Sequence, residues 1–138
     1  MAPEDRRLVG VLSDLARTVQ AVHERCAREQ DISPSLARLL IALSERTPTM
    51  NELAALLGLD KSSTSGLVDR AQRRGLVRRV ASQLDRRSVR VRLTKAGADR
   101  HRALTERFDT GLAAIIEPLD AEEREALAES LRAILSPR

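Results

Sequence analysis

The sequence predicts a mainly α-helical chain with a small β-hairpin wing: a winged helix-turn-helix flanked by N- and C-terminal dimerisation helices. Three observations lead to this fold class. Apolar residues recur at helical spacing near both ends of the chain, a glycine separates two short helical segments in the middle, and residues 89–93 alternate valine or leucine with arginine at the period of a strand. We expect the 138 residues (1–138) to form one domain, with the winged helix-turn-helix over residues 33–95.

The first predicted helix runs from Pro3 to Glu29 and carries a seam of apolar residues. The seam consists of Leu8, Leu12, Leu15, Val19, Val22 and Cys26. Alternating steps of four and three residues are typical of a helix that packs against a partner helix. We therefore expect residues 3–30 to pair two copies of the chain, together with apolar residues of the helices over 98–136, namely Ile115, Leu127 and Leu131.

Capping residues predict the next two helices. Residues 33–34, a serine and a proline, supply an N-cap and a first-turn proline for a helix that reaches about Glu45. Thr49 and Glu52 form a capping box at the start of a third helix, which Gly58 ends.

A fourth helix follows directly, with Asp60 as its N-cap and Gly75 just past its end. Its inward face should hold Thr64, Leu67, Val68 and Ala71. Two short helices joined by a tight glycine turn are typical of a helix-turn-helix.

A change of periodicity after Gly75 predicts the hairpin. Residues 76–80 and 89–93 should be its strands, with residues 81–88 as the connecting loop. From Thr94 the pattern is helical again to about Glu117, where Pro118 interrupts it. A last amphipathic helix over residues 120–135 should turn its apolar residues inward, namely Leu127, Leu131 and Ile134.

The positive charge of the chain is concentrated in one segment. From Asp69 to Lys95 there are ten basic and two acidic residues, so the rest of this chain of net charge +4 is acidic. A basic block in an otherwise acidic chain favours a site for a polyanion, although a solvated, salt-bridged face would have the same composition.

The candidate DNA contacts lie mainly on the fourth helix and the hairpin. Small polar side chains at the start of a helix can approach base edges in the major groove, and an arginine at a hairpin tip has the reach and charge to enter the minor groove. A neighbouring carboxylate such as Asp85 can hold that guanidinium in a fixed orientation. Helix capping by the serines and simple exposure of the arginines remain the alternative interpretations. The candidate DNA-binding residues are Thr49, Lys61, Ser62, Ser63, Ser65, Arg70, Arg73, Asp85, Arg86 and Arg87.

Other functional classes find little support. Single-stranded nucleic acids stack on aromatic side chains, whereas Phe108 is the only aromatic residue. The sequence has no glycine-rich phosphate loop, nucleophile elbow or paired-cysteine motif, so we expect no enzymatic activity, no cofactor and no metal. No window is apolar enough for a membrane span or signal peptide, and the lone cysteine cannot form an intrachain disulfide. These features favour the cytoplasm.

His23 and Cys26 leave two alternatives open. The two residues lie one helical turn apart and would provide half of a zinc site, which needs further ligands from elsewhere. A redox role for the thiol has only the nearby Arg25 and Arg28 to activate it. The simplest interpretation is that Cys26 is a small buried apolar residue.

The chain resembles the MarR family of bacterial regulators over nearly its whole length. Residues 85–94, Asp-Arg-Arg-Ser-Val-Arg-Val-Arg-Leu-Thr, are similar to the wing signature of that family. Residues 67–70 and 74–77 resemble its recognition-helix exit and first wing strand, and residues 49–57 resemble its first helix-turn-helix element.

This resemblance implies a homodimer that binds an inverted-repeat operator in double-stranded DNA. It also implies repression that is relieved by a small organic effector bound between the dimer helices and the winged region. Arg87 would be the minor-groove arginine, Asp85 would orient it, and Lys61, Ser62, Ser63 and Ser65 would face the major groove.

The chain departs from the family pattern at the wing tip, where Leu84 precedes Asp85 and the common proline is missing. It also lacks the early cysteine and the tyrosines of the peroxide-sensing branch, and the histidines of the zinc-sensing branch. A DNA-binding regulator without an effector and a winged-helix protein-interaction module remain the two alternatives.

Overall fold

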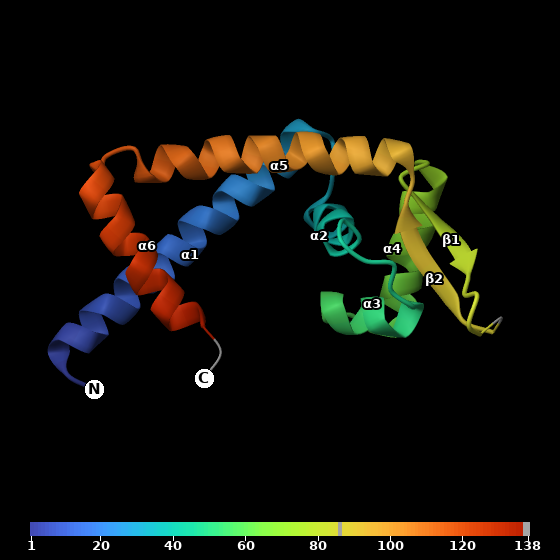
Figure 1. The fold of residues 1–138 in the computed structure, drawn as a ribbon, viewed down its shortest axis with the longest axis horizontal. Helices are drawn as coiled ribbons and strands as arrows, with labels where there is room; N and C mark the ends of the chain where they lie inside the picture. The colour runs from blue at the N-terminus through green and yellow to red at the C-terminus, as the bar shows by residue number, and fades with distance from the viewer. Residues whose placement is uncertain (86, 137–138) are drawn as a thin grey trace.

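The computed structural model describes residues 1–85 and 87–136. Across these residues the element order is α1 (Pro3–Glu29), α2 (Pro34–Ala42), α3 (Met50–Leu57), α4 (Lys61–Arg73), β1 (Val77–Ala81), β2 (Val89–Leu93), α5 (Lys95–Ile116) and α6 (Ala121–Leu135). Figure 1 shows α5 running along the molecule, with α6 and the N-terminal half of α1 at one end and α3, α4 and the hairpin at the other. The predicted fold class, a mainly α chain with a winged helix-turn-helix, is therefore confirmed.

Local sequence signals set the helix ends. Ser33 caps α2 by accepting a hydrogen bond from the Leu36 amide, and Thr49 and Glu52 form the predicted capping box of α3. Gly58 and Gly75 follow α3 and α4 with φ of 64° and 72°. Both values lie in the left-handed region, where a residue without a Cβ has no steric cost.

The core lies where α2, α3, α4 and the inner face of the hairpin meet the C-terminal part of α1 and the middle of α5. All four residues predicted for the inward face of α4 are buried, which confirms the orientation of that helix. The most deeply buried large side chains include Leu39, Leu40, Leu53, Val68 and Leu104. Because one face of α4 packs into the core, the opposite face is the one that is exposed.

The hairpin is antiparallel, with Val77 opposite Leu93 and Arg79 opposite Val91. The outer edge of β2 makes a further pairing that the sequence did not predict, because the Val91 amide donates to the Pro48 carbonyl at 2.9 Å. Thr49 also forms an isolated bridge with Arg90. The start of α3 and the wing are thus hydrogen-bonded to each other.

The predicted bounds of two elements are wrong. The helix expected to reach Glu45 ends at Ala42, where the Ser44 hydroxyl donates to the Ile41 carbonyl and competes with the helical pattern. The first strand begins at Val77 instead of Leu76, because the Leu76 amide closes the end of α4 on the Ala71 carbonyl.

The apolar seam of α1 divides into two parts. Val22 and Cys26 are buried against α5, and a Cβ added at Gly111 would lie 2.6 Å from a methyl carbon of Val22. This half of the seam therefore packs within its own chain. The other half does not, since Leu8 is 56% exposed and Leu12, Leu15 and Val19 are only partly buried.

The prediction that the apolar residues of the last helix turn inward is wrong for a single chain. All 15 residues of α6 are described, and none of them is buried. Leu127 and Leu131 remain partly exposed and Ile134 is 62% exposed, because α6 lies away from the core formed by α2, α3 and α4. Within the described ranges, no helix has the length and apolar content of a membrane span.

Candidate nucleic-acid interface

The first turn of α4 presents polar side chains at the surface. Lys61, Ser62 and Ser63 are exposed, whereas Ser65 is partly buried. Asp60 is the N-cap: its carboxylate accepts the Ser63 amide at 2.7 Å, and this hydrogen bond holds the pKa of Asp60 below its usual value. Since Asp60 supplies the cap, Lys61 and Ser62 are not needed for that purpose.

Among the predicted contact residues, Thr49 uses its side chain to cap a helix. Its hydroxyl accepts the Glu52 amide at 3.2 Å, and the Glu52 carboxylate accepts the Thr49 amide at 3.1 Å. The hydroxyl therefore builds the start of α3. Any contact made by Thr49 would have to use the remaining donor capacity of that hydroxyl.

Three arginines of the basic segment are bound within the fold. Arg79 pairs with the Asp69 carboxylate at 2.7 Å, Arg74 donates to the Asp31 carbonyl at 3.0 Å, and Arg90 donates to the Thr47 carbonyl at 2.8 Å. Their charge contributes to the local field, but their side-chain geometry is fixed by the protein.

Other arginines of the segment are exposed, and within residues 1–85 and 87–136 their guanidinium groups have no hydrogen-bonded or ion-paired partner. They are Arg70, Arg73, Arg78, Arg87 and Arg92. Two of them, Arg78 and Arg92, lie directly opposite each other on β1 and β2. Like charges in such a pair are unfavourable unless an anion or solvent screens them, so this surface is suited to a polyanion.

The wing tip is ordered by hydrogen bonds of the backbone. The Asp85 carboxylate accepts the Arg87 amide at 2.9 Å, and the Asp85 carbonyl accepts the Ser88 amide at 3.0 Å. The expectation that Asp85 holds the guanidinium of Arg87 therefore needs correction, because its carboxylate binds the backbone of that residue instead. Arg87 is exposed, and Arg86, the other predicted contact at this tip, lies outside the described residues.

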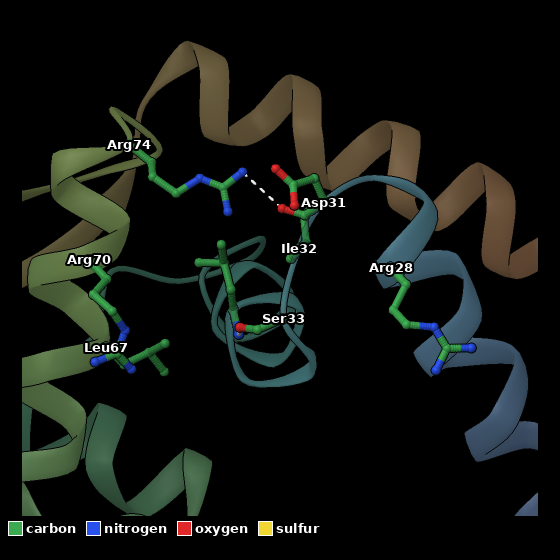
Figure 2. Close-up of a pocket in the computed structure, with 8 residues that line it drawn as sticks. Arg28, Asp31, Ile32, Ser33, Leu67, Arg70 and Arg74 are labelled. Carbon is green, nitrogen blue, oxygen red and sulfur yellow. Dashed lines mark hydrogen bonds between the residues drawn. The ribbon is translucent and has the colours of Figure 1, made fainter.

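A cavity of about 580 Å³ lies between α4, the end of α1 and the start of α2. Figure 2 shows Arg70 and Arg74 extending from α4 on one side, with Arg74 hydrogen-bonded to Asp31 in the α1–α2 connection. The remaining lining residues are Arg28, Ile32, Ser33, Leu36 and Leu67. Cationic groups above an apolar floor suit an anionic organic molecule. The sequence alone did not predict this cavity, because its walls come from two separate segments, residues 28–36 and 67–74.

Cys26 is buried, and His23 packs against an aromatic ring. Cys26 is 3% exposed, and the His23 ring lies 4.4 Å from the Phe108 ring between centroids. Among the side chains that the structure describes, no group of three potential metal ligands is brought together. The interpretation of Cys26 as a small buried apolar residue fits this environment.

A family model described as the MarR family matches residues 30–88, which run from the end of α1 through the wing loop. The uncharacterized HTH-type transcriptional regulator YfiV of Bacillus subtilis (strain 168) is 36% identical over 98 residues. The match covers 71% of this chain and 61% of that relative, so this chain spans less than two thirds of the relative's length.

Among the solved structures that share the fold are two regulators. Wild-type MarR from E. coli in its apo form has a TM-score of 0.83 and 21% identity, with 99% of this chain and 98% of that chain covered. A mutant of S. aureus MepR bound to an oligodeoxyribonucleotide has a TM-score of 0.69 and 21% identity, with 93% and 95% covered. At these identities the likeness is one of fold.

Proposed function

Because this chain belongs to the MarR family, we propose that it is a sequence-specific regulator of transcription that binds double-stranded DNA and not an enzyme. The observation that carries this proposal is the placement of two surfaces on adjacent elements. The exposed polar start of α4 and the exposed arginines of the hairpin are joined through the Asp69–Arg79 ion pair. The likeness to the DNA-bound MepR mutant supports the same conclusion.

The positions and charges of these elements suit a DNA duplex. A helix such as α4 can lie in the major groove with its N-terminal residues toward the base edges, here Lys61, Ser62 and Ser63. The wing would then meet the adjacent minor groove, where the negative potential attracts an arginine such as Arg87. Arg70 and Arg73, further along α4, would neutralise phosphates.

We further propose that the active form is a homodimer. The N-terminal half of the α1 seam and the apolar residues of α6 are not buried within one chain, and both lie at the end of the molecule opposite the wing. The exposed residues would be covered by the same surface of a second copy. Two wings related by such symmetry would read an inverted repeat.

The cavity beside α4 supports release by a small organic effector. A ligand bound there would bridge Arg70 and Arg74 of α4 to the α1–α2 connection, and Arg70 would then be withdrawn from phosphates. Because only differential binding shifts an equilibrium, such a ligand must favour the conformation that does not bind DNA. We propose that the regulator is a repressor released by this ligand and that it acts in the cytoplasm.

A footprint of the DNA upstream of the protein's own gene, combined with binding measured over a salt series, tests the proposal. A protected inverted repeat and a steep loss of affinity with salt are the expected results. No duplex binding at low salt would instead favour a protein-interaction module. A thermal-shift screen of small organic anions tests the effector, and uniformly unchanged melting temperatures would favour a regulator without one.

A further inference from the structure

Leu84 lies at the tip of the wing with its side chain 95% exposed. No other large apolar residue that the structure describes has a higher exposed fraction. A leucine in this position adds nothing to the core, and a polar residue would avoid the cost of its contact with water. The position therefore has no evident role in the folding of the isolated chain.

Hydrogen bonds constrain the backbone next to Leu84. The Leu84 amide donates to the Ser82 hydroxyl at 3.3 Å, and the Ser82 amide donates to the Ser88 carbonyl at 2.9 Å. Ser82 itself is buried, so it anchors the tip to the hairpin. The Asp85–Arg87 hydrogen bond follows Leu84 in the chain. The leucine side chain projects from the loop into solvent.

The charges near Leu84 indicate which kind of partner its side chain would contact. Arg87 lies three residues away on the same tip and is exposed, and the hairpin carries further exposed arginines at its base. Over residues 77–93 the sequence of the hairpin has six arginines and one acid. Electrostatics therefore direct the hairpin to a polyanion, not to an apolar protein surface or a lipid core. In the minor groove of DNA, the apolar surfaces available are the deoxyribose edges and the faces of the stacked bases.

We propose that Leu84 is a minor-groove wedge: its side chain enters the groove beside Arg87 and partly unstacks one base step. Leucine is among the apolar side chains that proteins use in this way. The wing then favours steps that unstack easily, namely pyrimidine–purine steps such as TA, and bends the duplex toward the major groove. This inference rests on the proposed function and adds a determinant of sequence preference that carries no charge.

The test uses the full-length protein and a duplex of about 30 base pairs recovered with it from a random-sequence pool, long enough for two half-sites. Hydroxyl-radical footprinting locates the step beneath the wing tip, and 2-aminopurine is placed there to report unstacking. Wild-type protein should raise the fluorescence and bend the duplex. Leu84→Ser should lose both effects and bind about tenfold more weakly, because the burial of the leucine is lost. The salt slope should stay unchanged, because the substitution removes no charge.

Matched variants separate the wedge from other effects. Leu84→Met should keep the fluorescence rise, because methionine is also a long apolar side chain. Val89→Ala trims the partly exposed valine paired with Ala81 at the base of the loop, and should keep both affinity and bend. A similar loss in the Val89 variant, or an unchanged fluorescence rise in Leu84→Ser, would overturn the inference. Absence of duplex binding by the wild-type protein would overturn the proposed function itself.

Discussion

The carboxylate of Asp69 on α4 lies 2.7 Å from the guanidinium of Arg79 on β1, and the same guanidinium donates to the Gln72 side chain at 2.8 Å. This ion pair connects the helix proposed to read the major groove with the hairpin proposed to reach the minor groove. Because both partners are partly exposed, its contribution to stability is small. Its larger effect is that the charges of Asp69 and Arg79 offset each other within the proposed interface.

Replacing Asp69 by asparagine should strengthen binding to a non-specific duplex, since it removes a negative charge and releases Arg79. The plot of log affinity against log salt should become steeper by about one unit, and the free energy of unfolding should fall by less than about 1 kcal/mol. Fluorescence anisotropy over a salt series and urea denaturation measure these quantities. Asp14→Asn removes an equal charge from the exposed Asp14–Arg17 pair on α1 and serves as the control. An equal gain from that variant would assign the effect to net charge alone.

Arg87→Ala should weaken operator binding by about 1–3 kcal/mol per half-site, because the minor-groove contact is lost in each wing. The salt dependence should become shallower, since fewer counterions are released. Arg87→Lys is the matched control: it should recover the salt slope but not the full affinity, because lysine lacks the planar guanidinium. An Arg87→Ala variant with wild-type affinity would show that the tip does not contact DNA.

Because the Asp85 carboxylate accepts the Arg87 amide, two substitutions at Asp85 should change DNA affinity in different directions. Asp85→Asn keeps an acceptor for that amide and removes a negative charge, so DNA affinity should be equal or higher. Asp85→Ala removes the acceptor, loosens the turn and should lower affinity in spite of the same change in charge. Electrophoretic mobility shifts on one duplex compare them. Tighter binding by both variants would mean that Asp85 acts through charge only.

Gly97 should tolerate no side chain, because a Cβ there would overlap the Leu76 carbonyl oxygen, which already accepts the Thr94 amide at 3.0 Å. Gly97→Ala should reduce the free energy of unfolding by about 3 kcal/mol or more through backbone displacement. Gly10→Ala is the control in a helix, where nothing lies within 4 Å of the added methyl group. That variant should gain about 0.5–1 kcal/mol. Urea denaturation of both variants checks the difference.

Leu15→Glu should convert the proposed dimer into a monomer, because it places two charges in the interface formed by the α1 seam. Ala21→Glu, an exposed position on the opposite side of the same helix, should leave the association unchanged. Sedimentation equilibrium at micromolar concentration distinguishes the two masses. A wild-type protein that sediments as a stable monomer would remove the dimer and the symmetric reading of an inverted repeat.

Most of the fold could be predicted from the sequence because the signals are local. The bounds of α1, the capping box of α3, the left-handed Gly58 and the alternation in β2 each depend on neighbouring residues. An amphipathic pattern predicts that a face will be buried, but it does not say which chain buries it. That is why the inward orientation predicted for Leu127 was wrong for a single chain.

The candidate site was less predictable because its geometry depends on contacts between distant segments. Residue types suggested that Asp85 would orient a guanidinium, whereas the fold of the tip gives its carboxylate to a backbone amide. The cavity beside α4 combines residues as far apart as Arg28 and Arg74, and no periodic pattern relates them. The candidates Lys61, Ser62, Ser63, Ser65 and Arg87 could be proposed from the sequence because each lies on an element whose type the sequence predicts.

The hydrogen bond between the Val91 amide and the Pro48 carbonyl has a consequence for regulation. It attaches β2 to the segment that begins α3, while β1 contacts α4 through Arg79, so motion of the wing is coupled to the helix-turn-helix. A ligand at the α1–α2 connection would then displace the helix-turn-helix and the wing together. The two halves of an operator would be recognised at a different separation, while the bases read within each half would stay the same.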